Sequence, residues 1–265
     1  MVAPLSLVVY PDLARHVEAL ERDGYAYFPR VLDLGAVDEL RETMDRLEPV
    51  EAGFDCNSHD DGFFEKIINN AFNRDPLFLQ YLDHPPIIEL AETVHGKDAH
   101  VIGMTVWITG PGRPAQKLHT DWLPVSLPED ILADPRVKLP LFITTANFYL
   151  DDIYEALGPT NVIPGSHRAG RQPNPAETNW NGVESQSIIC HAGDVAMFRC
   201  EIWHQGTANQ SNEPRYLLQV HYAKRMITQK FPPYLNRFQF DPEILSRATP
   251  RQRRLMGEHR RSNYD

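Results

Sequence analysis

The first 97 residues carry their apolar side chains mostly at helical spacing. Apolar residues recur three and four positions apart over residues 11–22 and again over residues 34–47, which predicts two amphipathic helices. Asp33 stands immediately before the second segment, where a carboxylate can cap the first turn of a helix. Residues 75–95 predict two further helical stretches, which are divided by a Pro-Pro pair and stopped by a glycine.

The pattern changes near residue 98, where short β-rich runs begin that are broken by Gly and Pro. The predicted strands cover residues 99–109, 113–119, 140–150, 185–190, 194–204 and 215–228. Helical segments do not alternate with them as parallel βαβ units would require, so the spacing predicts an antiparallel sandwich or barrel of the jelly-roll kind. The long, proline-punctuated excursion over residues 122–139 is a candidate binding loop or lid.

Two shorter segments complete the predicted organisation. Residues 25–31 are expected to form a strand, and residues 51–72, rich in Gly, Asn and Asp, a loop with one helical turn. We therefore expect a mainly β fold with flanking helices, built as one domain. Its parts are a mostly helical segment (1–97) packed outside, a jelly-roll core (98–230) and a C-terminal extension (231–265).

Composition and charge narrow the class of protein. The chain has 265 residues, 42% of them hydrophobic, with a formal net charge of −10 and a pI near 5.5. These values fit a folded acidic domain and argue against a nucleic-acid-binding surface. The three cysteines include no Cys-x-x-Cys pair, so neither a disulfide framework nor a structural zinc site is indicated.

The same sequence features predict where the protein acts. No apolar run reaches the roughly 18 residues that cross a bilayer, and the N-terminal segment lacks the basic region of a secretory signal. We expect a cytoplasmic protein, a monomer or homodimer, whose partner is a small molecule and neither nucleic acid nor a membrane.

The candidate chemistry begins with two His-x-Asp sequences. A pair of this kind arises by chance in a chain with eleven histidines, so its context must decide. His59 lies in a polar Asn- and Asp-rich stretch and is expected to be structural or solvated. His119 and Asp121 instead end a β-rich segment, where residues two apart face the same side of a strand. They are therefore expected to converge on one metal ion.

A third metal ligand is expected from the end of the predicted strand 194–204, which is His204. A hairpin after this strand would bring Arg215 back beside it. Two imidazoles and one carboxylate leave three coordination positions open, which is the arrangement of non-haem Fe(II) oxygenases. An arginine near that face can bind a carboxylate with two parallel hydrogen bonds.

Motifs spread over nearly the whole chain strengthen this interpretation. They are ERDGYAYFPRVLD, NNAFNRDPLFLQYLDHP, GPGRPAQKLHTDW, LGPTNVIPGSHRAG, HAGDVAMFRCEIWHQG with NEPR following, and MGEHRRSNYD. Together they resemble the phytanoyl-CoA dioxygenase-like (PhyH) branch of Fe(II)/2-oxoglutarate-dependent oxygenases, and within it the enzymes that tailor natural products. The resemblance implies a double-stranded β-helix (jelly-roll) core, bound Fe(II), and 2-oxoglutarate and O2 as cosubstrates.

The resemblance also assigns roles to individual residues. It implies that His119, Asp121 and His204 are the iron ligands and that Arg215 binds the distal carboxylate of 2-oxoglutarate. Two further positions match residues that contact this cosubstrate in related enzymes, namely Gln116 and Thr160.

Other residues near the expected site have two interpretations each. Lys66 matches a position at which some relatives carry a basic residue that reaches the substrate pocket, but it also fits a surface lysine. Trp122 follows Asp121 directly and either lines the pocket or packs beside it. His221, in the last predicted strand, is expected to pack near the site and not to bind the metal.

The function that the resemblance implies is the oxidation of a small molecule, with 2-oxoglutarate converted to succinate and CO2. The outcome is hydroxylation, or epimerisation or cyclisation after hydrogen abstraction, in secondary-metabolite (antibiotic-type) biosynthesis. Asp121 stands where related halogenases carry a small residue, so halogenation is disfavoured.

Two other classes of protein stay open at this point. A non-catalytic jelly-roll protein could keep the fold and bind a metal or ligand, although it would be expected to have lost a metal ligand or Arg215. A metal-dependent hydrolase or isomerase could use zinc in the same place, although it would give Arg215 and Gln116 no role.

Overall fold

The computed structural model describes residues 13–50, 56–58, 62–132, 134, 136–231 and 238–260, with the backbone alone for 56–58. The His-x-Asp sequence that begins at His59 lies outside the described residues. Within the described ones, the helices are too short or too polar for any of them to cross a bilayer.

The largest sheet has seven strands, and all of its neighbouring strands pair antiparallel. Its order is β1 (Tyr25–Phe28), β10 (Val195–Arg199), β5 (Ile143–Tyr149), β12 (Arg215–Ala223), β4 (His100–Thr109), β3 (Glu65–Asn69) and β2 (Cys56–Ser58). Strands distant in sequence lie side by side in this order, as a jelly roll requires.

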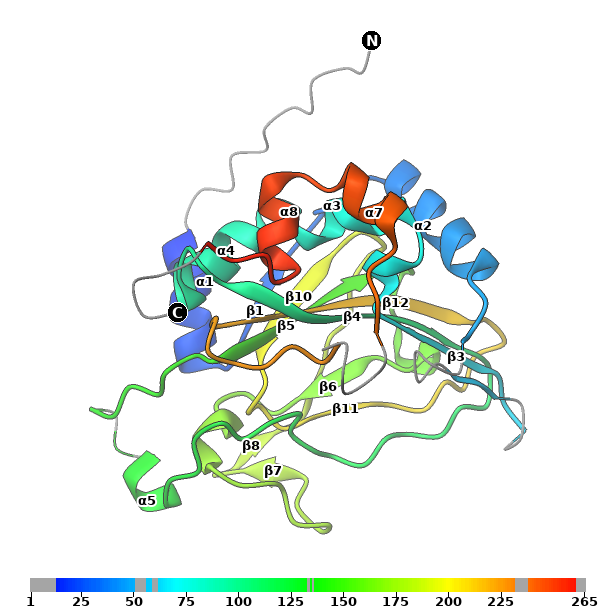
Figure 1. Cartoon of the computed structure of the whole chain (residues 1–265). Coiled ribbons are helices and arrows are strands. Elements are labelled where there is room, and N and C mark those ends of the chain that lie inside the picture. The colour runs from blue at the N-terminus through cyan, green and yellow to red at the C-terminus, as the bar shows by residue number, and fades with distance from the viewer. Residues whose placement is uncertain are drawn as a thin grey trace.

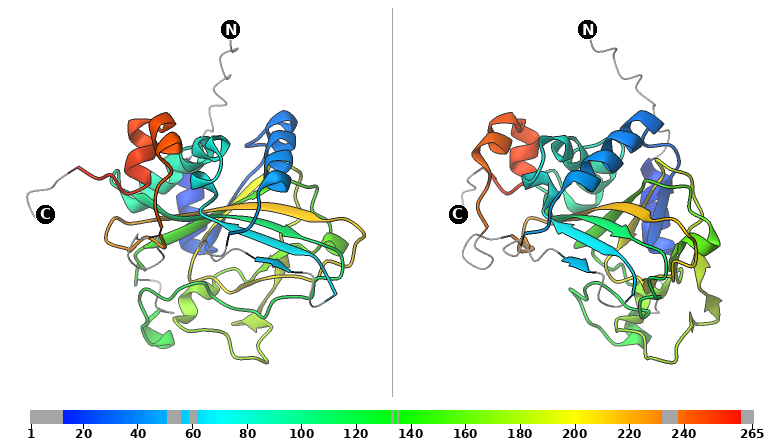
Figure 2. Two further views of the ribbon diagram at one scale, coloured as in Figure 1. Left: turned by 45° about the vertical axis from the view of Figure 1, so that its right-hand side comes forward. Right: turned by 90° about the vertical axis from the view of Figure 1, so that its right-hand side faces the viewer.

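A second, smaller sheet lies on one side of the large sheet (Figures 1 and 2). Its order is β11 (His204–Gly206), β6 (Thr160–Val162) and β9 (Gln186–Ser187). Beyond it lie a two-stranded ribbon, β7 (Asn179–Trp180) and β8 (Val183–Glu184), and the short helix α5 (Glu129–Leu132). The predicted excursion over residues 122–139 thus contains one helix, which contacts the 3-10 turn η5 (Ser166–Ala169).

Helices cover the other side of the large sheet (Figure 1). They are α1 (Leu13–Arg22), α2 (Leu34–Arg46), α3 (Leu79–Leu82), α4 (Ile87–His95), α7 (Pro242–Arg247) and α8 (Pro250–Leu255), with the 3-10 turns η2 (Ala71–Asn73) and η3 (Pro76–Phe78). The carboxylate of Asp33 accepts a hydrogen bond from the Ala36 N–H at 2.8 Å and caps α2, as predicted.

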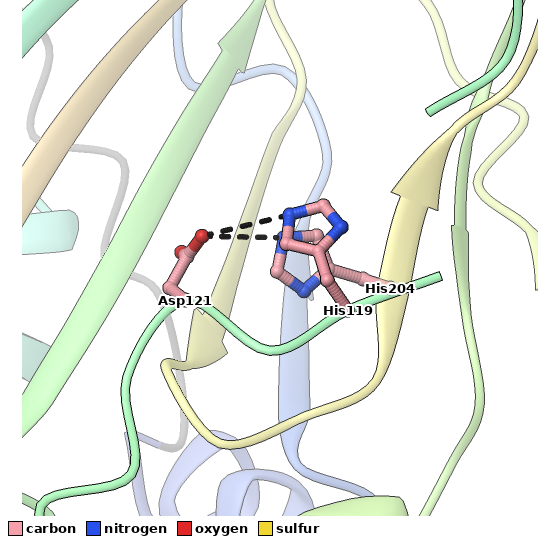
Figure 3. A group of neighbouring side chains, drawn as sticks. All are labelled: His119, Asp121 and His204. Atoms are coloured by element: carbon pink, nitrogen blue, oxygen red, sulfur yellow. Dashed lines mark ion pairs between the residues drawn. The ribbon is translucent and has the colours of Figure 1, made fainter. Parts of the chain in front are cut away.

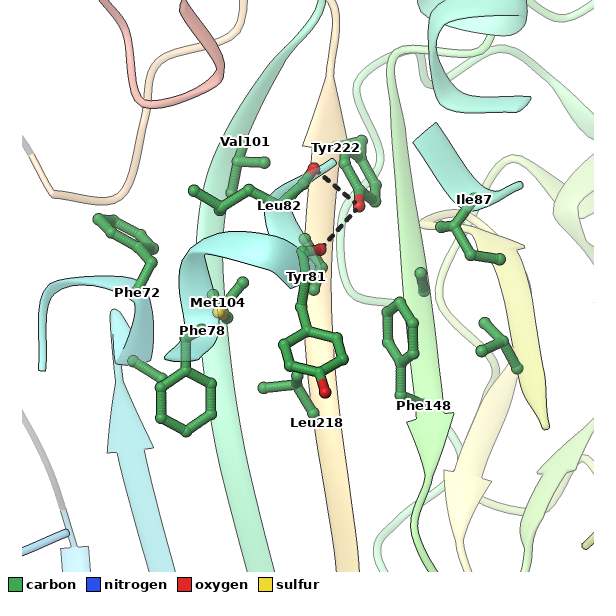
Figure 4. Packing of buried hydrophobic residues seen from close by; sticks show 14 of the residues in the cluster. Phe72, Phe78, Tyr81, Leu82, Ile87, Val101, Met104, Phe148, Leu218 and Tyr222 are labelled. Carbon is green, nitrogen blue, oxygen red and sulfur yellow. Dashed lines mark hydrogen bonds between the residues drawn. The ribbon is translucent and has the colours of Figure 1, made fainter. Parts of the chain in front are cut away.

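Apolar side chains fill the space between the helices and the large sheet. In Figure 4, Phe78, Tyr81 and Ile87 of the helical layer lie against Leu218 and Phe148 of the sheet. Removing this apolar area from water at about 25 cal/mol per Å2 is the main force that attaches the helices to the sheet.

The strand β12 shows how the fold separates core from cavity. Its alternate residues Tyr216, Leu218, Val220 and Tyr222 face the helices and belong to the hydrophobic core. The intervening residues, which include Arg215, Gln219 and His221, therefore face the small sheet. A buried strand with polar side chains on one face only indicates that this face lines a site.

Three predicted elements differ from the structure. Residues 65–69, predicted as part of a loop, form β3 at the edge of β4, and the helical turn follows as η2. Residues 113–119, all of them described, form no strand beyond a single bridge between His119 and His204. The predicted strand 194–204 is two strands, because a turn closed by the Ile202 N–H and the Arg199 carbonyl carries the chain from one sheet to the other.

Lys66 does not reach the cavity, so the expected contact with substrate is wrong. It alternates on β3 with residues that face the cavity side, and its side chain turns toward the helical layer. Its Nζ donates to the carbonyls of Asp45 (2.9 Å), Leu47 (3.0 Å) and Met44 (3.4 Å). These carbonyls end α2 and lack partners within the helix, so Lys66 caps that helix.

Replacing Lys66 tests this structural role. Lys66→Met leaves three carbonyls at the end of α2 without their donor, so we expect the free energy of unfolding to fall by about 1–3 kcal/mol. Urea denaturation measures the loss, with Lys138→Met, at an exposed lysine, as the control. If the variant instead loses substrate affinity while its stability is unchanged, Lys66 contributes to the substrate pocket and not to the end of α2.

Candidate active site

His119, Asp121 and His204 converge in the cavity between the two sheets (Figure 3). One ligand atom from each lies within 4.8 Å of the other two. The Nε2 atoms of His119 and His204 lie 3.8 Å and 3.6 Å from the Asp121 carboxylate. This spacing leaves room for an ion between the three atoms, and among the described residues it is the one cluster of at least three His, Cys, Asp or Glu side chains that could hold a metal.

Backbone hydrogen bonds fix where the three residues stand. The N–H of each histidine donates to the carbonyl of the other, at 3.0 Å and 2.9 Å, which holds the irregular segment before His119 against β11. The Asp121 N–H donates to the Cys200 carbonyl at 3.0 Å. The side-chain amide of Gln172 makes two hydrogen bonds with the backbone of Thr120. The His-x-Asp turn is therefore held on both sides.

The same surroundings prepare both imidazoles for metal binding. Nδ1 of His119 lies 2.7 Å from the Lys117 carbonyl, and Nδ1 of His204 lies 3.0 Å from the Ile202 carbonyl. A carbonyl only accepts, so each Nδ1 carries the hydrogen and each Nε2 presents its lone pair toward Asp121. Burial, followed by the neighbouring His204, lowers the pKa of His119, which favours its neutral, ligating form.

Arg215 approaches this cluster from the opposite sheet. The predicted hairpin is wrong, because His204 begins β11 in the small sheet whereas Arg215 begins β12 in the large one. The two strands face each other across the cavity, and Arg215 lies close to the β11 residue Gly206. Arg215 therefore reaches the cavity from the large sheet and not through a hairpin after β11.

The guanidinium of Arg215 lacks a charge partner in the part of the chain that the structure describes. The residue is 8% exposed, and its buried Nε has no hydrogen-bond partner there. Burial lowers the pKa of Arg215, although an arginine stays protonated even so. Leaving a buried cation unpaired is costly, so this position is suited to receive an anion.

A cavity of about 170 Å3 joins Arg215 to the metal-ligand cluster. It exceeds the roughly 30 Å3 that one water molecule occupies, so it has room for a small molecule. Gln116 and Thr160 line it. The Gln116 Oε1 accepts from the Gly206 N–H at 2.9 Å, which leaves its NH2 group available to a ligand.

Unpaired polar atoms surround the same cavity. Buried side-chain oxygens without a partner there belong to Asn147 and Thr109, both of which line it. Buried polar atoms in folded proteins are almost always hydrogen-bonded. The Thr109 hydroxyl can donate to a carboxylate, whereas the Asn147 amide oxygen can only accept. An open hydroxyl donor beside an unpaired arginine fits a carboxylate-bearing ligand such as 2-oxoglutarate, and two imidazoles with one carboxylate fit Fe(II).

Comparison with known proteins identifies the class. Residues 20–217 match the phytanoyl-CoA dioxygenase (PhyH) family. The chain belongs to this family. The match extends from α1 into β12 and includes the three cavity residues of Figure 3 and Arg215. The prediction of an Fe(II)/2-oxoglutarate-dependent dioxygenase is confirmed.

Relatives of this dioxygenase carry the same class name. Dioxygenase ALT11 of Alternaria alternata is 27% identical over 257 residues, which cover 89% of this chain and 79% of the relative. Dioxygenase cdmA of Talaromyces verruculosus is 25% identical over 269 residues, which cover 91% of this chain and 81% of the relative. The similarity thus spans most of both proteins in each case.

Solved structures share the fold. The α-ketoglutarate-dependent epimerase SnoN from nogalamycin biosynthesis aligns with a TM-score of 0.64 at 22% identity, covering 80% of this chain and 83% of its own. HygX of Streptomyces hygroscopicus, with nickel and 2-oxoglutarate bound, aligns with a TM-score of 0.62 at 17% identity. The alignment covers 82% of this chain and 89% of the HygX chain. These likenesses confirm the jelly-roll prediction.

Trp122 does not line this part of the cavity. Its indole packs edge-on against the imidazole of His221, with ring centroids 5.6 Å apart, and Lys230 Nζ lies 4.2 Å from the centre of its ring. His221 is buried and pairs through Nδ1 with the Thr145 hydroxyl at 2.9 Å, so it packs beside the site as expected.

Sequence reasoning missed several cavity residues of the dioxygenase. Arg113 lines the cavity beside Arg215 and pairs with Glu65 at 3.1 Å, and the Trp107 indole N–H donates to Gln219 at 2.6 Å. A signal for them exists in the sequence, because polar residues interrupt otherwise apolar strands at every second position. These polar positions can be assigned to the cavity only once the face of each strand that lines the cavity is known.

Removing one histidine tests the metal site. His204→Ala deletes an Nε2 ligand, and because loss of a residue that merely orients a ligand costs 10–100-fold, we expect Co(II) affinity to fall by more than about 100-fold. Isothermal titration measures it. His191→Ala is the control, because His191 also pairs with an aspartate but lies exposed on the surface. Wild-type affinity in His204→Ala would place the metal elsewhere.

Proposed function

We propose that this dioxygenase oxidises a small organic molecule at the cavity between its two sheets, in a pathway of secondary metabolism. In this proposal His119, Asp121 and His204 hold Fe(II), and Arg215 binds the distal carboxylate of 2-oxoglutarate. The observation that carries it is the buried, unpaired guanidinium of Arg215, facing a His-Asp-His cluster across one shared cavity.

Each residue of the proposed site has a defined role. When bound, Fe(II) with 2-oxoglutarate and O2 supplies the oxidising chemistry of the family. The Lys117 and Ile202 carbonyls keep both imidazoles in the ligating tautomer. We assign to the Gln116 amide and the Thr160 hydroxyl, both of which line the cavity, the role of hydrogen-bonding the cosubstrate.

The outcome that we propose is hydroxylation, or epimerisation or cyclisation that follows hydrogen abstraction. The structural neighbours include an epimerase, SnoN, and a carbocyclase, SnoK, both from nogalamycin biosynthesis, which supports this range. We further propose that the 265 residues act as one domain in the cytoplasm, as a monomer or homodimer, on a small-molecule substrate.

Absorption and product release test the proposal together. Under anaerobic conditions, Fe(II) with 2-oxoglutarate should give the weak visible band of a chelated cosubstrate, and with O2 the protein should release succinate. Arg215→Leu removes a charged hydrogen-bond donor, so the 2-oxoglutarate concentration for half-saturation should rise at least about tenfold, with the iron requirement much less affected.

The matched control is Arg22→Leu, at an arginine on the surface that pairs with Asp23. It should bind 2-oxoglutarate like the wild type. Absence of the visible band in the wild type, or an unchanged 2-oxoglutarate requirement in Arg215→Leu, would contradict the proposed function.

A further inference from the structure

Gln172 contacts the His-x-Asp turn from a segment that is distant in sequence. Its Oε1 accepts a hydrogen bond from the Thr120 N–H at 2.9 Å, and its Nε2 donates to the Thr120 carbonyl at 3.1 Å. Thr120 stands between the ligands His119 and Asp121 and is buried. Among the described residues, its N–H and its carbonyl have no other hydrogen-bond partner. One amide side chain therefore satisfies both peptide groups at the centre of the turn.

These two peptide groups determine how the ligands on either side point. The Thr120 N–H belongs to the peptide bond that follows His119, and the Thr120 carbonyl belongs to the peptide bond that precedes Asp121. Each peptide bond is planar, so turning either plane changes a backbone dihedral angle of the adjoining ligand. Buried peptide groups are almost always hydrogen-bonded, which favours the orientation that Gln172 holds.

Arg171, the residue before Gln172, contacts the chain beside the third ligand. Its carbonyl accepts a hydrogen bond from the Trp203 indole N–H at 3.0 Å, and its guanidinium lies over the same indole, 5.0 Å from the ring centre. Trp203 is fully buried and directly precedes His204. Two adjacent residues thus contact the chain next to all three proposed metal ligands.

Ion pairs fix the segment from which Gln172 reaches the turn. The Arg171 guanidinium lies 2.7 Å from the Glu177 carboxylate and 3.3 Å from that of Glu129 in α5. The Trp180 indole N–H, on β7, donates to the same Glu129 carboxylate at 3.0 Å. Gln172 is not among the residues that line the cavity, so it acts on the metal site through the backbone of the turn.

We infer that Gln172 is a positioning residue for the metal ion, anchored by Arg171, and that it raises metal affinity by orienting His119 and Asp121. The inference rests on the proposed function, because it requires that these side chains hold a metal. Without the amide, both peptide groups of Thr120 can turn toward water, and the two ligands lose their common direction. Partners that orient metal ligands typically account for 10–100-fold in metal affinity.

Co(II) binding tests the inference, because calorimetric titration gives its affinity and its visible d–d absorption reports the ligand geometry. Gln172→Ala removes both hydrogen bonds, so we expect Co(II) affinity to fall about 10–100-fold and the d–d bands at saturating Co(II) to change. Gln172→Glu keeps an acceptor for the Thr120 N–H but cannot donate to the carbonyl, so we expect an intermediate loss.

Two further variants separate positioning from a general loss of stability. Arg171→Met removes the ion pairs but keeps the Gln172 amide, so it should lose less Co(II) affinity than Gln172→Ala. Gln210→Ala, at an exposed glutamine elsewhere on the surface, should behave like the wild type. Urea denaturation of the metal-free proteins measures stability. A merely structural role would lower stability and leave the Co(II) absorption of the folded protein unchanged.

The two proposals fail in different ways. If the wild type does not bind Co(II), the proposed function fails and the inference fails with it. If the wild type binds Co(II) and folded Gln172→Ala binds it with the same affinity and absorption, the inference alone is overturned. It is also overturned if Gln172→Ala loses no more affinity than Gln210→Ala. Should Gln172→Ala not fold, Gln172→Glu decides by the same two measurements.

Discussion

The two-residue alternation of a β-strand is the constraint on which this structure depends. Each strand of the large sheet must present one face to the helices and the other to the small sheet. On β12 the first face is apolar and completes the core, whereas the second carries Arg215, Gln219 and His221. A shift of one residue would bury these side chains among the helices and expose the core, so fold stability and site geometry are set by the same register.

This constraint explains what could be read from the sequence. Helix periodicity, the Asp33 cap and the longest strands depend on neighbours in sequence, and they were predicted closely. The His119 and Asp121 pair was predicted from strand spacing, but the structure holds it by backbone bonds to Cys200 and His204 and by Gln172. A local pattern therefore suggested the correct pair, while distant contacts produce its geometry.

The errors have a common physical origin. The predictions for the end of β10 and for a hairpin between His204 and Arg215 were wrong because each depends on which sheet a segment joins. The prediction for Lys66 was wrong because it depends on which face of the sheet a side chain occupies. Sheet pairing is decided by contacts between residues that are far apart in sequence. Lys66 lies on the helix face of β3 because its neighbour Ile68 fills the core, and no feature of the segment itself specifies that face.

The proposed site requires that a carboxylate binds Arg215 while a metal ion is held by His119, Asp121 and His204. A crystal structure of the protein with Ni(II) and 2-oxoglutarate tests it most directly. We expect nickel to be bound by Nε2 of both histidines and by Asp121, with the far carboxylate of 2-oxoglutarate on the Arg215 guanidinium. Nickel bound by other residues, or that carboxylate turned away from Arg215, would contradict it.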